Sequence, residues 1–180
     1  MSAVRRVVVG VHGSLGSLQA LRLAAEEARD REAVLVPVIA WTPPGGDFAE
    51  RSHPSPYLRK IWRDAARQRL SEAFDAGLGG VPDDVPVQAR VERGEAGLVL
   101  TDVADRPDDL LVIGTGRRSP VSRALRKSVG RYCLAHAKCP MLAVPPSALM
   151  NEVGHGLRLW PLGRHPVVPD ISELSGKQGQ

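Results

Sequence analysis

The apolar residues along the chain change their spacing several times between the period of a β-strand and that of an α-helix. Short runs rich in valine, isoleucine and leucine are typical of strands that are buried on both faces. Between them lie segments in which apolar residues recur every three or four positions among charged ones, as in amphipathic helices. The runs, with one alternating segment, predict strands at 7–11, 33–41, 85–91, 110–114 and 141–144, and the segments between them predict helices at about 18–31, 58–74, 95–104 and 128–136.

The predicted strands and helices alternate along the chain, with a strand first. Strands that alternate with helices of this length form a mostly parallel sheet whose two faces are both covered. We therefore predict an α/β fold: a five-stranded, mostly parallel open sheet with helices on both faces, of the Rossmann-like kind. Pro37 lies within the second predicted strand and has no backbone donor, which indicates an edge position or a bulge.

The alternating pattern ends at two consecutive prolines, Pro145 and Pro146. The chain has 180 residues, which is enough for one domain with a short appendage. We place the domain at 1–146 and expect 147–180, which lack periodicity, to form a weakly ordered tail or an interaction arm. Apolar residues make up 43% of the chain, but no apolar run approaches the roughly 20 residues that a membrane span needs.

Charge and cysteine content narrow the cellular setting without defining a ligand. The net charge of +4 at pH 7 is compatible with nucleic acid, with nucleotides or with no anionic partner. The two cysteines, Cys133 and Cys139, are too few for a disulfide framework, and the first residues lack the pattern of a signal peptide. We therefore expect a cytoplasmic protein in which both cysteines are small buried fillers.

Two glycine-containing turns follow predicted buried strands, at residues 10–14 and within 113–132. Ligands of open parallel sheets bind at the carboxyl ends of the strands, where the strand order reverses. A glycine-rich turn that leads into a helix presents unpaired N–H groups and the positive end of the helix dipole, which favours phosphate. The second turn also carries many cations, although a solvated basic helix face would have the same composition: Arg117, Arg118, Arg123, Arg126, Lys127 and Arg131.

No spacing in the chain indicates a catalytic constellation or a set of metal ligands. His12 has no neighbouring carboxylate or cysteine in the sequence, which favours a hydrogen-bonded turn histidine over a base or a ligand. His136 and Cys139 are two candidate metal ligands without a second pair. We therefore predict no catalytic residue and no metal site.

Across residues 4–146 the chain resembles universal stress proteins of the UspA type. The segments that carry this resemblance are the first strand and turn, the second strand, the third strand with its helix, and the C-terminal segment with Cys-Pro before the last strand: VVVGVHGS, VPVIAWTP, VERGEAGLVLTDVA and LLVIGTGRRSPVSRALRKSVGRYCLAHAKCPMLAVPP. It implies the universal stress protein type of sheet and a cytoplasmic role in stress or dormancy. It also implies a homodimer that forms through the strand at Met141–Val144.

One branch of this family binds ATP, with Mg²⁺, through the motif G-x2-G-x9-G-(S/T), and another branch does not bind it. Gly114 matches the first glycine of the motif, and Ser128 matches the final hydroxyl. Arg117 occupies the second glycine position, with Gly116 one place early, and Lys127 occupies the third. At these two positions the side chains of Arg117 and Lys127 fill space that glycine would leave free, and they add positive charge. Binding of an anion is therefore expected, while binding of ATP in the family's usual pose is left open.

Two further positions are matched through the resemblance. His12 stands where nucleotide binders usually carry aspartate, and Val38 stands where the family often contacts adenine through its backbone. The resemblance therefore implies a site for an adenine nucleotide or another anion at the ends of the first and fourth strands: Gly10, Val11, His12, Val38, Gly114, Gly116, Arg117, Lys127, Ser128 and Val129.

Four functions remain open at this point. The first is a stress-response regulatory binding protein, an adenine-nucleotide or anion binder without catalytic turnover, with slow ATP hydrolysis left open. The second is a dimeric scaffold of the same fold that binds no nucleotide, because Arg117 and Lys127 fill the site. An enzyme that transfers adenylate ranks lower, since GVHGSLGS lacks a pyrophosphate-binding signature. Nucleic-acid binding through 117–131 also ranks lower, and would weaken steeply with salt.

Overall fold

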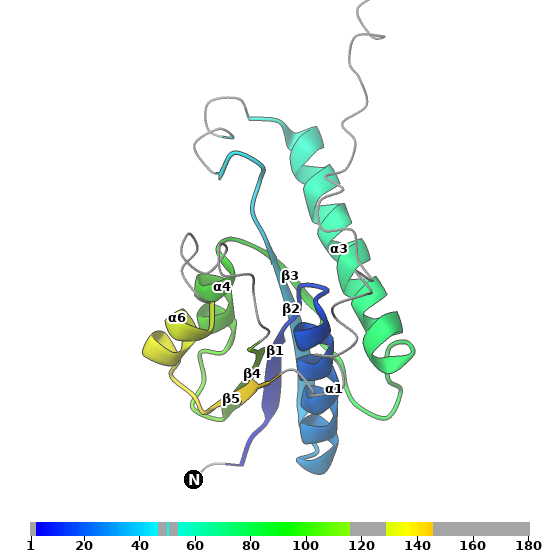
Figure 1. Ribbon diagram of the computed structural model, residues 1–180, viewed down its shortest axis with the longest axis vertical. Helices are drawn as coiled ribbons and strands as arrows, with labels where there is room; N and C mark the ends of the chain where they lie inside the picture. The colour runs from blue at the N-terminus through cyan, green and yellow to red at the C-terminus, as the bar shows by residue number, and fades with distance from the viewer. Residues whose placement is uncertain (1–2, 47–49, 51–53, 116–128, 146–180) are drawn as a thin grey trace, which may run out of the picture.

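The described part of the chain folds into one parallel sheet between two layers of helices. The computed structural model describes residues 3–46, 50, 54–115 and 129–145. In these ranges the elements are β1 (Arg6–Gly10), α1 (Leu15–Asp30), β2 (Val34–Trp41), α3 (Pro56–Leu78), β3 (Arg90–Arg93), α4 (Ala96–Val103), β4 (Asp109–Gly114), α6 (Val129–His136) and β5 (Met141–Val144). The strands pair in the order β3-β2-β1-β4-β5, and all the pairs are parallel (Figure 1). The predicted α/β class is confirmed, and the sheet is parallel throughout these strands.

Successive residues of the central strands enter two different cores, because strand side chains alternate between the faces of a sheet. Val7 and Val9 of β1 pack into the core beneath α1 and α3. Val8, between them, packs with Leu111 of β4 into the core beneath α4 and α6. Figure 1 shows the two helical layers on opposite sides of the sheet. A strand that is covered on both faces needs apolar residues at every position, which explains the continuous apolar runs in the sequence.

The expectation that Pro37 marks an edge strand or a bulge is wrong. β2 lies inside the sheet between β1 and β3, and Pro37 is fully buried. Leu35 donates its N–H to the carbonyl of Pro86 at 2.9 Å and accepts from Gln88 at 2.8 Å, on the side of β3. Pro37 is the next residue on that side, so its missing N–H removes a hydrogen bond to β3 and none to β1.

The third strand is shorter than the sequence predicts, because Pro37 of the neighbouring strand cannot donate a hydrogen bond to it. The segment 85–91 was expected to be a strand, but β3 extends from Arg90 to Arg93. Ahead of it, Val87 forms one isolated bridge with Leu35. The ladder is interrupted between this bridge and β3, at the point where Pro37 has no N–H to donate.

The long helix α3 starts and ends at residues with clear local signals. The hydroxyl of Ser55 accepts the N–H of Leu58 at 3.3 Å, and Pro56 follows in the first turn, where no N–H is required. Gly79 ends the helix in the left-handed conformation with a φ of 77°. The helix is therefore longer at both ends than the apolar spacing over 58–74 predicts.

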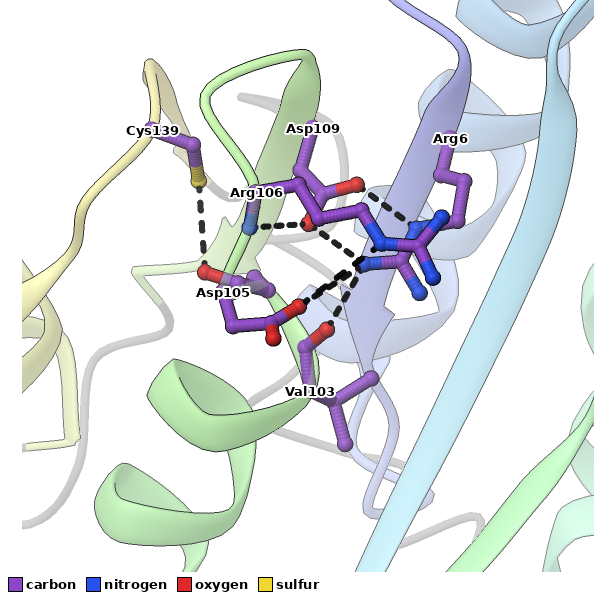
Figure 2. Close-up of polar contacts among 7 residues, drawn as sticks. Arg6, Val103, Asp105, Arg106, Asp109 and Cys139 are labelled. Carbon is purple, nitrogen blue, oxygen red and sulfur yellow. Dashed lines mark hydrogen bonds and ion pairs between the residues drawn. The ribbon is translucent and has the colours of Figure 1, made fainter.

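A buried ion pair joins the amino ends of β1 and β4 (Figure 2). Arg6 donates from Nε and Nη2 to the two oxygens of Asp109, both at 2.7 Å, and the Asp109 side chain is fully buried. Asp109 also accepts the N–H of Arg106 at 3.0 Å, while Nη2 of Arg6 reaches the carbonyl of Val103 at 3.1 Å and Asp105 at 3.2 Å. The hydrogen bonds with Asp109 raise the pKa of Arg6.

The turn after α1 holds a non-glycine residue in the left-handed region. Glu32 has a φ of 50°. Its N–H donates to the carbonyl of Arg29 at 3.1 Å, and the N–H of Ala33 donates to that of Ala28 at 2.8 Å. This pair of bonds is a Schellman ending, in which glycine is the usual residue because it has no Cβ.

Removing the buried carboxylate is expected to destabilise the protein strongly. Asp109→Ala leaves the guanidinium of Arg6, whose side chain is only 13% exposed, without its main partner. The loss of one member of a buried pair typically costs about 3–5 kcal/mol. Urea denaturation of both proteins measures the difference. Asp64→Ala, which removes an exposed ion pair with Lys60 on α3, is the matched control and should leave the urea midpoint near that of the wild type. Equal midpoints for the two variants would contradict the structural role of Asp109.

Glu32→Gly is expected to stabilise the protein. Glycine adopts a positive φ without strain, and the gain of about 0.5–1 kcal/mol corresponds to a rise of a few degrees in Tm. Glu32→Ala is the control, because it removes the same charge but keeps the Cβ. Thermal melting of the three proteins measures the effect, and a glycine variant that melts no higher than the alanine variant would show that φ at this position is not limiting.

Candidate functional site

The carboxyl ends of β1 and β4 lie at the point where the strand order of the sheet reverses. β1 pairs with β2 on one side and with β4 on the other. The connections that leave β1 and β4 therefore diverge, and the crevice between such connections is where open parallel sheets bind ligands. The predicted site residues 10–12 and Gly114 lie at these two strand ends, which are neighbours because β1 pairs with β4.

Hydrogen bonds hold the turn between β1 and α1. Val11 donates its N–H to the carbonyl of Val38 at 2.8 Å and so extends the pairing of β1 with β2. His12 donates its N–H to the hydroxyl of Ser17 at 3.3 Å. Ser14 caps α1, because its hydroxyl accepts the N–H of Ser17 at 3.3 Å. The turn thus presents the amino end of α1 to the switch point.

The imidazole of His12 belongs to this same turn. It is exposed, and its Nε2 lies 3.3 Å from the hydroxyl of Ser14. Gly13 lies between the two residues with a φ of 80°, a conformation that favours glycine and lets the turn close. His12 therefore sits beside the cap of α1, where the helix dipole is positive.

Gly114 ends β4 at a place where no side chain fits. A Cβ added there would lie 2.3 Å from the carbonyl oxygen of Gly16 and 3.1 Å from the nitrogen of Ser17. Both atoms belong to the backbone of the first turn of α1, which cannot move aside as the end of a flexible side chain would. Gly114 therefore brings the carboxyl end of β4 into contact with the amino end of α1, whose first N–H groups lack partners within the helix.

The other predicted residues at this end of the sheet are accounted for by packing and pairing. A Cβ on Gly10 would lie 2.9 Å from Leu100 of α4, and Val38 is buried with only its carbonyl directed to the turn. Ala40 is the next residue of β2 that faces β1; it is half-buried and was missed by sequence reasoning. Val129 opens α6 and packs against the core beneath α4 and α6.

The segment that leaves β4 is tied to the last strand. Thr115 donates from its N–H and from its hydroxyl to the carbonyl of Val144, at 2.8 and 3.1 Å. The predicted cradle continues beyond Thr115, but four of its predicted members lie outside the described residues: Gly116, Arg117, Lys127 and Ser128. The tail predicted at 147–180 also lies outside them.

A cluster of charges at the carboxyl end of β3 had no signal in the sequence. Glu50 has a side chain that is only 6% exposed and pairs with Arg59 of α3 and with Arg93 of β3, both at 2.6 Å. Residues 42–56 contain four prolines and two glycines, a composition that predicts only a loop. The two ion pairs join Glu50 to the first turn of α3 and to β3, and the three side chains together carry one net positive charge.

The cysteines and the remaining candidate ligands carry little chemistry. Cys133 is buried and Cys139 is half-buried, and burial raises the pKa of both thiols, which keeps them protonated at neutral pH. Within the described ranges, no three histidine, cysteine or acidic side chains come together as metal ligands. Over the same ranges, no helix has the length and apolar character to cross a membrane.

Solved structures share this architecture over most of the chain. A universal stress protein solved in complex with cAMP is 28% identical; the match covers 81% of this chain and 100% of that one, with a TM-score of 0.52. Universal stress protein UspA from Lactobacillus plantarum is 17% identical, with coverage of 80% and 99% and a TM-score of 0.54, and its likeness shows the fold.

The model of one protein family matches nearly the whole described sheet and its helices. It covers residues 3–145 and describes the universal stress protein family. The match includes both turns at the switch point and the Cys-Pro before the last strand. This chain therefore belongs to the universal stress protein family.

Proposed function

We propose that this protein is a regulatory binding protein that holds an adenine nucleotide at the carboxyl ends of β1 and β4. The observation that carries the proposal is the contact of Gly114 with the backbone of Gly16 and Ser17. It brings the amino end of α1 to the switch point of the sheet, where ligands of such folds bind. A family member that is 28% identical was solved with cAMP, which supports an adenine nucleotide as the ligand.

The two ends of the proposed ligand would meet different chemistry. The purine would lie over the ends of β1 and β2, where Val11 is buried and Ala40 is half-buried. The phosphate would lie toward the segment 116–128, in which Arg117 and Lys127 supply positive charge. Arginine can bind a phosphate group through two parallel hydrogen bonds, so the cation replaces part of what a glycine cradle supplies.

The same two side chains favour a small phosphate end. Glycines in a phosphate cradle allow backbone N–H groups to approach several phosphate oxygens, and residues with long side chains at two of those positions are expected to leave less room for a chain of phosphates. We therefore propose AMP or cAMP as the preferred class of ligand, with Mg-ATP as the weaker candidate. The described residues of the site include no carboxylate, so we propose binding without turnover and assign no catalytic residue.

Dimerisation and location complete the proposal. β5 is one of the two edge strands of the described sheet, with Ala143 exposed and Met141 half-buried, so another β5 can pair with it. We propose a cytoplasmic homodimer that forms through Met141–Val144. A scaffold that binds no nucleotide is the second candidate, because Arg117 and Lys127 stand at two glycine positions of the ATP motif.

Thermal melting with ligands tests the nucleotide proposal directly. A ligand at one hundred times its Kd stabilises the folded state by about 2.7 kcal/mol, which is a rise of about 5–10 °C for a chain of this size. We expect AMP and cAMP to raise the Tm more than Mg-ATP at equal concentration, and sodium sulfate to have little effect. An equal shift with sulfate would indicate a general anion site, and no shift with any nucleotide would favour the scaffold.

The double variant Arg117→Gly/Lys127→Gly tests the specificity. It restores glycine at both motif positions and removes two charges, so Mg-ATP should bind at least tenfold more tightly, while AMP should weaken. Lys60→Gln/Arg67→Gln removes two exposed charges from α3 and is the control for net charge. Titration calorimetry of the three proteins measures both affinities. A double variant that gains no affinity for Mg-ATP would contradict the idea that these side chains set the preference.

A further inference from the structure

A hollow of about 600 Å³ lies at the amino ends of β1, β2 and β3, at the opposite end of the sheet from the proposed nucleotide site. Its walls come from the start of β1, the turn between α1 and β2, the residues that lead into β3, and the turn before β4. The charged residues among its lining are five arginines and one acid: Arg5, Arg6, Arg31, Arg90, Arg106 and Glu32.

The arginines come from distant parts of the sequence but share one small space. A hollow of this volume is about 10 Å across, close to the Debye length of about 8 Å at physiological ionic strength. Positive charges at such separations repel one another through a medium that screens them only partly. Their convergence is therefore unfavourable unless neighbouring acids or a bound anion compensate it.

Two of the five arginines have their own compensation. Arg6 is fixed by the buried Asp109 and also contacts Asp105, as Figure 2 shows. Arg31 pairs with Glu27, one turn earlier in α1. We regard Arg6 as part of the fold, because the removal of its charge would leave Asp109 buried without a partner.

The other three arginines are held weakly. Arg106 lies 4.0 Å from Asp105, and Arg90 lies 3.8 Å from Glu92, and the side chains of both arginines are at least half exposed. Ion pairs of this kind contribute little to stability and are readily exchanged for another anion. Arg5 is exposed, and no partner for its side chain is found in the part of the chain that the structure describes.

We propose that this hollow binds a small anion that carries two or more phosphate groups. Guanidinium groups bind phosphate oxygens in pairs and are the cations best suited to this geometry. The volume lies within the range of small-molecule sites, about 300–1,000 Å³, which favours a compact ligand over a nucleic-acid strand. Three of the arginines are exposed enough to turn toward a bound phosphate ligand: Arg5, Arg90 and Arg106. Glu32 is the one acid of the lining, and its negative charge would repel such a ligand.

The experiment titrates the full chain with inorganic tripolyphosphate by calorimetry at low salt, with and without saturating AMP. We expect binding whose Kd is the same under both conditions, because AMP is proposed to bind at the other end of the sheet. Displacement of tripolyphosphate by AMP would place both ligands in one site and overturn the proposal. A nucleotide titration that fails while tripolyphosphate still binds would overturn only the proposed function.

Matched variants separate the hollow from the general charge of the protein. Arg5→Gln/Arg90→Gln should bind tripolyphosphate at least tenfold more weakly, while Lys60→Gln/Arg67→Gln, which loses the same charge on α3, should stay within about twofold of the wild type. Thermal melting of each variant without ligand confirms that the fold is retained. Equal losses in the two double variants would mean attraction by net charge alone and overturn the proposal.

Two further measurements address the acid and the class of ligand. Glu32→Gln removes the opposing carboxylate and should tighten the binding of tripolyphosphate several-fold. A single-stranded DNA 20-mer should compete poorly. Unchanged affinity in Glu32→Gln, or a 20-mer that binds more tightly than tripolyphosphate and loses that binding in Arg5→Gln/Arg90→Gln, would overturn the assignment to a small phosphate ligand.

Discussion

The backbone contact between Gly114 and the first turn of α1 determines the geometry of the carboxyl end of this sheet. α1 must cover both β1 and β4 to bury the apolar core beneath it, and it crosses β4 where that strand ends. Any Cβ at position 114 would collide with the carbonyl of Gly16, so the helix and the strand meet only because residue 114 lacks a side chain. Close approach then leaves the unpaired N–H groups of α1 at the switch point. The same contact that closes the core thus creates the polar surface on which the proposed ligand depends.

The amino end of the sheet is joined in a different way. There β1 and β4 are connected by the side chains of Arg6 and Asp109, a buried charge pair to which the turn before β4 adds a hydrogen bond from the N–H of Arg106. Such a pair is weak evidence for high stability, since its desolvation offsets much of its attraction, but it requires one register between the two strands. It also fixes Arg6, one of the five arginines that line the hollow. The two ends therefore offer different chemistry to an anion: backbone N–H groups and a helix dipole at one, guanidinium groups at the other.

The fold was predictable because strands covered on both faces leave continuous apolar runs, and Val7–Val9 is such a run. Pro37 was misplaced because the absence of one N–H affects only the neighbour on that side, and the sequence does not show which side faces β3. At the site, Gly114 was found through a motif, but its contact with Gly16 joins positions far apart in the chain. The ion pair of Glu50 with Arg93 and the arginine hollow also depend on positions far apart in the chain, and local patterns carry no signal for either.

β1 supplies residues to both ends, so it is the natural route by which one ligand could affect the other. Its central residues are fully buried and the strand is paired on both sides, and a shift of one residue would turn its apolar side chains to the wrong face. Motion along β1 is therefore a poor means of coupling. Direct electrostatic coupling is also small: charges about 20 Å apart interact by about 0.2–0.8 kcal/mol at effective dielectric constants of 80 to 20, before screening by salt. This is at or below the low end of the 1–3 kcal/mol typical of allosteric effects. As far as β1 and direct charge interaction are concerned, two ligands bound at the opposite ends of the sheet are therefore expected to act nearly independently.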